Sequence, residues 1–178
     1  MLSSNNGKGG LDLNDIRFSE YLHDLYRVLR DPGHMYLMVN FHNLETALAE
    51  IRRAGFGLHT LLVARKNNVT PSRWYMKNVE YTIFARKGAA FPIRNFGSKV
   101  CHDWTNPVGN KHNPNEKSVE LMRLYVENST TKGEIVLDPF SGSGSVGLAC
   151  QETGRRFIGF EADPAHYLTA CRRLRIMP

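Results

Sequence analysis

The sequence predicts an α/β fold in which helices cover a mostly parallel sheet. Three observations carry this prediction: a short apolar run at 135–137 ends at Asp138, a glycine-rich segment at 141–145 comes next, and a second apolar run at 157–160 ends at Glu161. The first run is too short for a helix and is typical of a buried strand. Two glycines in the next segment allow a tight turn and close approach of a ligand. Together these segments predict a Rossmann-like nucleoside-binding unit.

The remaining elements are predicted by local patterns. Apolar residues at helical spacing predict a helix over 18–29, which the sequence Asp31-Pro-Gly33 ends. The other expected elements are a strand at 35–39, a helix from the candidate cap Asn43 to Gly55, a hairpin of strands 58–63 and 79–85, a helix from 119, a helix ending near 153, and a last helix capped by Asp163 with Pro164 at its first position.

The residues at the end of the first strand indicate which nucleoside is bound. Gly142, Gly144 and Gly147 have the spacing of a dinucleotide fingerprint, but Asp138 and Pro139 place a carboxylate where a pyrophosphate would dock. A carboxylate repels phosphate and pairs with an ammonium group. S-adenosylmethionine carries an ammonium, a sulfonium and a ribose but no phosphate. The residues therefore favour this cofactor, and a nicotinamide oxidoreductase is the disfavoured alternative.

The segment Asp138-Pro-Phe-Ser-Gly-Ser-Gly-Ser145 resembles the cofactor motif of the amino-type DNA methyltransferases, which methylate adenine N6 or cytosine N4. Residues 154–174 are similar to that family's second cofactor segment, and 112–126 resemble the segment before the cofactor strand. The resemblance extends over nearly the whole chain, in the order of the permuted subclass with the cofactor motif late. It implies a methyltransferase fold, with an antiparallel hairpin at the sheet edge, that acts on DNA.

The resemblance implies that Asp138 lies at the methionine end of the cofactor with Phe140 nearby, and Glu161 is expected to bind the ribose. Each of these residues also has a purely structural alternative, as a turn residue, a cap or an exposed strand-end acid. Lys117 belongs to the looser part of the match, because Ser118 stands where the family has proline. The expected cofactor-binding set is Asp138, Pro139, Phe140, Ser141, Gly142, Gly144, Ser145, Glu161 and Lys117.

The family's catalytic motif, Asp/Asn/Ser-Pro-Pro-aromatic, has no counterpart, because the sequence contains no Pro-Pro pair. We therefore expect that the chain starts downstream of that motif and that its sheet is incomplete. The slot would be filled by residues 1–10, an upstream segment, a partner chain or direct closure of its neighbours. Asn40 and Phe41 offer an amide and a ring as a substitute. The alternative to a truncated enzyme is a catalytically inactive module that binds cofactor or DNA.

The net charge of +6 and the pI of about 9.4 suit a polyanionic partner such as DNA, with simple solubility as the alternative. Cations interleaved with aromatic residues between 86 and 112 predict either a target-recognition segment or an ordered surface loop. The residues expected to bind DNA are Arg65, Lys66, Arg73, Arg86, Arg94, Lys99 and Lys111.

The length of 178 residues suits one domain. We expect residues 1–14 to be a mobile loop or tail, 15–87 a catalytic-side half, 88–112 a target-recognition loop, and 113–178 a cofactor-binding half. Three widely spaced cysteines without a C-x-x-C pair argue for a reducing compartment and against a metal site. No apolar run approaches about 18 residues, so a cytoplasmic protein without a membrane span is expected.

Overall fold

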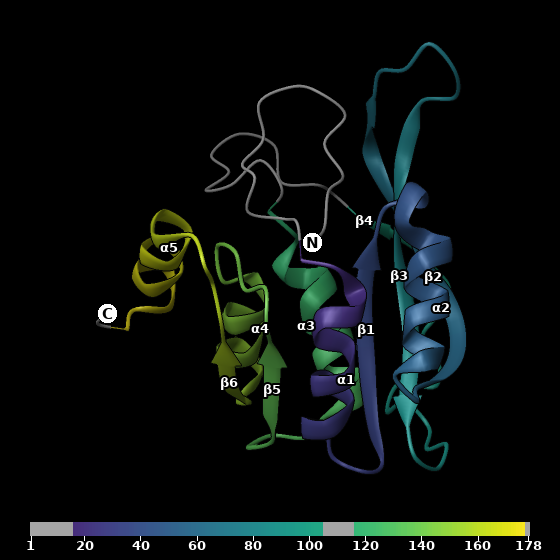
Figure 1. The fold of residues 1–178 in the computed structure, drawn as a ribbon. Coiled ribbons are helices and arrows are strands. Elements are labelled where there is room, and N and C mark those ends of the chain that lie inside the picture. Colours follow the sequence, from purple (N-terminus) through teal and green to yellow (C-terminus); the bar gives the residue numbers. More distant parts are fainter. Residues whose placement is uncertain (1–15, 105–115, 177–178) are drawn as a thin grey trace. The chain divides into compact units, whose positions relative to one another are not determined.

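The computed structural model describes residues 16–104 and 116–176 (Figure 1). Their Cα positions group into two compact units, residues 16–92 with 97–104 and residues 93–96 with 116–176. The expectation of one domain with halves at 15–87 and 113–178 stays a prediction, and the expected tail at 1–14 lies outside the described residues. The elements are α1 (Phe18–Val28), β1 (Gly33–Val39), the 3₁₀ turn η2 (Phe41–Asn43), α2 (Leu44–Arg53), β2 (Gly57–Thr70), β3 (Lys77–Lys87), β4 (Cys101–Trp104), α3 (Val119–Ser129), β5 (Ile135–Asp138), α4 (Ser145–Thr153), β6 (Arg156–Gly159) and α5 (Pro164–Leu174).

The first unit contains a four-stranded sheet in the order β1-β3-β2-β4. β3 runs antiparallel to β1 and β2, whereas β4 runs parallel to β2, so β3 is the reversed strand of this sheet. The expected hairpin is present as β2 and β3, and its last register pair before the turn is Thr70 with Lys77. Both strands are longer than the predicted ranges 58–63 and 79–85, because the cross-strand ladder continues into polar residues beyond the core.

β4 was not predicted, because residues 88–112 were expected to form a loop. The strand is short, and it is held by its ladder with β2, in which Val63 pairs with Cys101 and Lys66 with Trp104. A pairing between segments this far apart in sequence leaves no local periodicity. The same strand places Trp104 among buried residues, with 9% of its surface exposed.

The core of the first unit lies between one face of the sheet and helices α1 and α2. Residues that pair across β1 and β3, such as Leu37 with Ile83, point to the same face because strand side chains alternate. Leu22 of α1 and Ile51 of α2 are fully buried against this face. The buried cluster consists of Phe18, Leu22, Val39, Ala47, Ile51, Ala54, Phe56, Ile83 and Ala85.

The second unit contains β5 and β6 as a parallel pair, in which Val136 lies beside Phe157 and Asp138 beside Gly159. Helix α4 packs closely on the Val136–Phe157 face: a Cβ at Gly147 would come within 2.9 Å of the Phe157 ring. On the opposite face, Ile135 is 49% exposed and Leu137 is 37% exposed. The expectation of a buried strand at 135–137 is therefore wrong for these two residues, since only one face of the strand is covered.

The ends of the last elements bring the candidate site together. α4 ends at Thr153 as predicted, and the N-cap of α5 is confirmed, because Asp163 Oδ1 accepts from the amides of Ala165 and His166 at 2.8 and 2.9 Å. β6 ends at Gly159, so Glu161 lies in the turn after the strand. In the ranges 16–104 and 116–176 no helix has the length and apolar character required to cross a bilayer.

Candidate functional site

A glycine loop connects β5 to α4. Gly142 and Gly144 have φ values of 53° and 81°, a left-handed conformation that other L-residues rarely adopt. A Cβ at Gly142 would meet no atom within 4 Å, so open space lies beside this backbone. Gly144 instead lies against α5, where a Cβ would come within 3.2 Å of Ala170. The two glycines therefore serve different purposes: Gly142 leaves room for a ligand, and Gly144 allows close packing of the helices.

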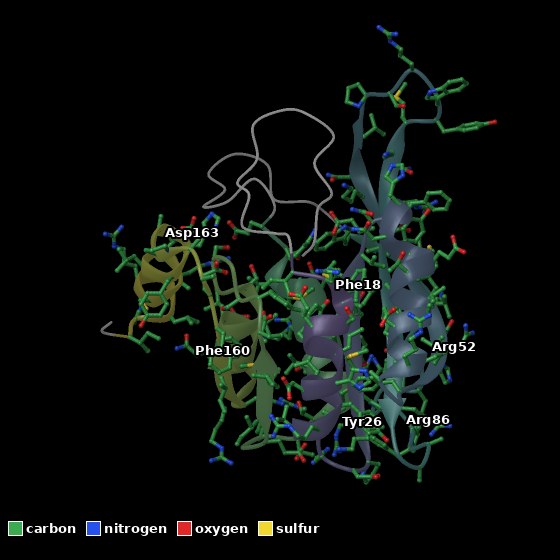
Figure 2. All side chains as sticks on the ribbon, viewed as in Figure 1. Phe18, Tyr26, Arg52, Arg86, Phe160 and Asp163 are labelled. Atoms are coloured by element: carbon green, nitrogen blue, oxygen red, sulfur yellow. The ribbon has the colours of Figure 1, made fainter. Side chains whose placement is uncertain are left out.

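Glu161 joins this loop to the end of β6. Its Oε2 accepts a hydrogen bond from the Gly142 amide at 2.7 Å, and its Oε1 accepts one from the Asp163 amide at 2.9 Å. The Ser141 amide also donates to the Phe160 carbonyl at 2.8 Å. Because a carboxylate has about four acceptor positions, Glu161 keeps acceptor capacity for ligand hydroxyls after these two bonds. Figure 2 shows Phe160 and Asp163, which flank this acid along the chain.

Asp138 is the last residue of β5 and lies beside Gly159 of β6. Its Oδ1 accepts a hydrogen bond from the Phe140 amide at 3.0 Å. Burial raises the pKa of Asp138, and the charge of Glu161 raises it further, whereas the hydrogen bond from Phe140 lowers it. The raised pKa means that the ionised carboxylate lacks full compensation within the protein.

The two carboxylates and the open glycine loop define the ligand chemistry of the site. Asp138 and Glu161 influence each other electrostatically, so their combined field attracts a cationic group and repels phosphate. The residues fit the three features of S-adenosylmethionine: Asp138 can pair with an ammonium, Glu161 can accept from ribose hydroxyls, and Gly142 allows close approach. The same residues fit a dinucleotide poorly, since its pyrophosphate would lie beside a carboxylate.

Sequence reasoning missed Arg173 on the last turn of α5. Its Nη1 donates to the Ser143 carbonyl at 3.2 Å and lies 3.3 Å from Ser145 Oγ, while its Nη2 forms an ion pair with Glu116 at 2.6 Å. The Arg173 and Glu116 side chains are 15% and 6% exposed, so this ion pair is largely buried. The Ser145 hydroxyl also donates to the Lys117 carbonyl at 2.9 Å. Arg173 thus ties the glycine loop to the segment that precedes α3.

The other residues of the expected cofactor set divide by position. Pro139, Phe140, Ser141 and Ser145 lie in the loop that joins Asp138 to α4, so the structure brings them to the site. Lys117 approaches the loop through its backbone carbonyl. Ser118 occupies the N-cap position of α3, a place where serine is favoured. This cap accounts for serine at the position where the family has proline.

Asn40 comes directly after β1, and its side chain has a structural use. Its Oδ1 accepts a hydrogen bond from the Asn43 amide at 2.9 Å and so caps the turn η2. The expectation that Asn43 provides the cap of α2 is wrong, because its side chain makes no capping bond and the intervening 3₁₀ turn moves this task to Asn40. Phe41 is 68% exposed. The amide oxygen that a catalytic substitute would offer is therefore already in use.

The residues expected to bind DNA do not form one patch. Arg65 pairs with Asp103 at 2.8 Å and Lys66 with Glu80 at 3.5 Å, whereas Arg73 lies in the exposed turn of the hairpin. Arg86 lies near the end of β3 that is far from this turn (Figure 2). Arg94 belongs to the second unit, Lys99 to the first, and Lys111 lies outside the described residues.

Fold and site together define a Rossmann-like protein with a site for a nucleoside that carries a positive charge. A model of the DNA methylase family, the N6/N4 methyltransferases, matches residues 14–172, and the chain belongs to this family. The chain is 30% identical over 165 residues to YubD of Escherichia coli K12, covering 92% of this chain and 71% of the relative. It is 26% identical over 166 residues to the type II methyltransferase M2.DpnII of Streptococcus pneumoniae, covering 83% of this chain and 62% of the relative.

Solved structures lead to the same family. The M1.HpyAVI–SAM complex superposes with a TM-score of 0.79 at 28% identity, covering 89% of this chain and 82% of that one. A DNA modification methylase from Thermus thermophilus, TTHA0409, superposes with a TM-score of 0.72 at 21% identity, covering 90% and 78% of the two chains, and supports the fold. The incomplete, mostly parallel sheet with a hairpin expected from the sequence therefore has solved relatives.

We predict that Asp138→Asn stabilises the ligand-free chain increasingly as the pH rises. The folded-state pKa of Asp138 is raised above its ordinary value of 3.8, so its contribution is most favourable below that value and is lost as the pH rises through the folded-state pKa. Urea unfolding at several pH values measures the difference. Asp163→Asn is the control of opposite sign, because its pKa is lowered by amide hydrogen bonds. A pH-independent effect of Asp138→Asn would contradict the prediction.

We predict that Arg173→Met and Glu116→Leu each cost about 3–5 kcal/mol, because each leaves the other charge buried without its partner. The double variant should lose much less than the sum, since both charges are then gone. Denaturant unfolding of the four proteins gives the coupling energy. Arg172→Met, at an exposed neighbouring position, is the control. Additive losses in the double variant would show that the pair is not coupled.

Proposed function

We propose that this chain provides the cofactor-binding part of an S-adenosylmethionine-dependent DNA methyltransferase, which transfers a methyl group to adenine N6 or cytosine N4. One observation carries the proposal: the carboxylates of Asp138 and Glu161 flank an open glycine loop in a chain of the DNA methylase family. The solved SAM complex of M1.HpyAVI supports the choice of cofactor.

Each residue of the site has a role in this proposal. When bound, the cofactor supplies a methyl group activated by its sulfonium. Asp138 pairs with the cofactor's ammonium, which also compensates for the burial that raises the pKa of this acid. Glu161 fixes the Gly142 amide and accepts hydrogen bonds from the ribose. Arg173 keeps Ser143 and Ser145 in place, so that the loop is formed before the ligand arrives.

DNA is the partner in this proposal, and the net charge of +6 supports it. Methylation of an exocyclic amine requires the target base to leave the stack. Arg73 and Lys99 are exposed and supply phosphate contacts in the proposal. Arg65 and Lys66 contribute less, because their charges are paired with Asp103 and Glu80.

A further strand is also part of this proposal. β1 ends the order of the first sheet and β5 ends that of the second, so each leaves one ladder edge without a strand among the described residues. An unpaired strand edge is a ready template for pairing. We propose that an upstream segment or a partner chain supplies a strand to such an edge and brings the catalytic group that Asn40 does not offer.

Calorimetric titration of the chain with S-adenosylmethionine tests the cofactor assignment. We expect saturable binding, and about 10- to 100-fold weaker binding for Glu161→Gln, because a charged acceptor of ribose hydroxyls is lost. Glu152→Gln, an exposed acid on α4, is the matched control. A parallel titration with NAD should show no binding. Binding of NAD in preference to S-adenosylmethionine would contradict the assignment.

A further inference from the structure

The hairpin of β2 and β3 extends beyond the helices that cover its base (Figure 1). The ladder continues to Thr70 and Lys77, with a register shift between Arg65 and Thr70. Residues 71–76 form the turn between the two strands. The base of the hairpin belongs to the core through Leu61 and Ile83, so the far end is held on a fixed support. A two-stranded ribbon of this kind has the dimensions of a DNA groove.

The tip carries large side chains in water. Trp74 is 90% exposed, Tyr75 is 95% exposed and Met76 is 62% exposed. Single exposed apolar residues are common, but three in succession at the end of a projecting hairpin form a patch, and such patches indicate an interaction surface. The folding of the first unit does not explain these residues, because its core cluster contains none of them.

The charge of the tip selects the kind of partner. Residues 67–79 contain Arg73 and Lys77 but no aspartate or glutamate. Neither cation has an ion pair within the described residues, in contrast to Arg65 and Lys66 nearer the core. Aromatic rings next to unpaired cations match a nucleic acid, which offers base faces for stacking and phosphates for charge pairing.

We infer that the hairpin tip, residues 71–77, is a DNA wedge. Trp74 and Tyr75 stack on bases or enter a base step, while Arg73 and Lys77 hold the adjacent phosphates. Partial unstacking of this kind kinks a duplex and lowers the cost of taking a base out of the stack. The inference rests on the proposed function for its choice of DNA as partner, and it assigns a role to side chains outside the cofactor site.

Tryptophan fluorescence tests the wedge directly, because the sequence contains only Trp74 and Trp104. Trp74 is 90% exposed and Trp104 is 9% exposed, so quenching by a duplex of about 30 base pairs at low salt reports on the tip. We expect quenching in the wild type, and loss of the signal with retained affinity in Trp74→Phe. The double variant Trp74→Ala/Tyr75→Ala should bind about 5- to 100-fold more weakly. Arg73→Gln should lower the salt slope by about 1.

Two controls isolate the tip. Arg52→Gln removes an exposed cation of α2, and Leu168→Ala removes a 41% exposed apolar residue of α5; both should leave DNA affinity unchanged. S-adenosylmethionine affinity should be the same in all variants, so failure of the cofactor assignment shows in the wild-type titration alone. DNA binding with unquenched Trp74 and an unaffected double variant would overturn the wedge. So would absence of DNA binding together with self-association that the double variant abolishes in sedimentation.

Discussion

The second unit depends on the hydrogen bonds of one carboxylate. Glu161 accepts from the amides of Gly142 and Asp163, and so holds the loop after β5 against the turn after β6. Without it, Gly142 would keep its left-handed backbone but lose the partner of its amide, which is costly wherever water cannot replace the bond. The same acid has lone pairs left over for a ligand. Structural support and ligand recognition therefore use one group.

Asp138 and Arg173 show two opposite ways of treating a buried charge. Arg173 meets Glu116 and the oxygens of Ser143 and Ser145, so its charge is compensated within the protein. Asp138 receives one amide hydrogen bond and lies near a second acid, which leaves its charge under-compensated and its pKa raised. A site that binds a cation benefits from this arrangement, because the missing compensation comes from the ligand.

The sequence predicted those parts whose determinants are local. Asp163 with Pro164 marks the start of α5, and the glycine loop comes after its strand as expected. The Arg173–Glu116 pair was not predicted, because it joins segments that meet only after folding. β4 escaped prediction for the same reason, since its ladder with β2 provides its order. The exposure of Ile135 and Leu137 depends on which neighbours cover a strand, and an apolar run alone cannot specify this.

The charges of the chain are separated in a way that its two ligands require. A phosphate near Asp138 and Glu161 would be repelled by the same field that attracts an ammonium. A DNA backbone must therefore be held by other residues, and the cations at the hairpin tip, Arg73 and Lys77, belong to the first unit, whereas both acids belong to the second. A polyanion and a cationic cofactor then bind one chain without competing for a surface. The aromatic residues beside the cations add stacking, which salt does not screen, so contact with DNA at the tip need not depend on charge alone.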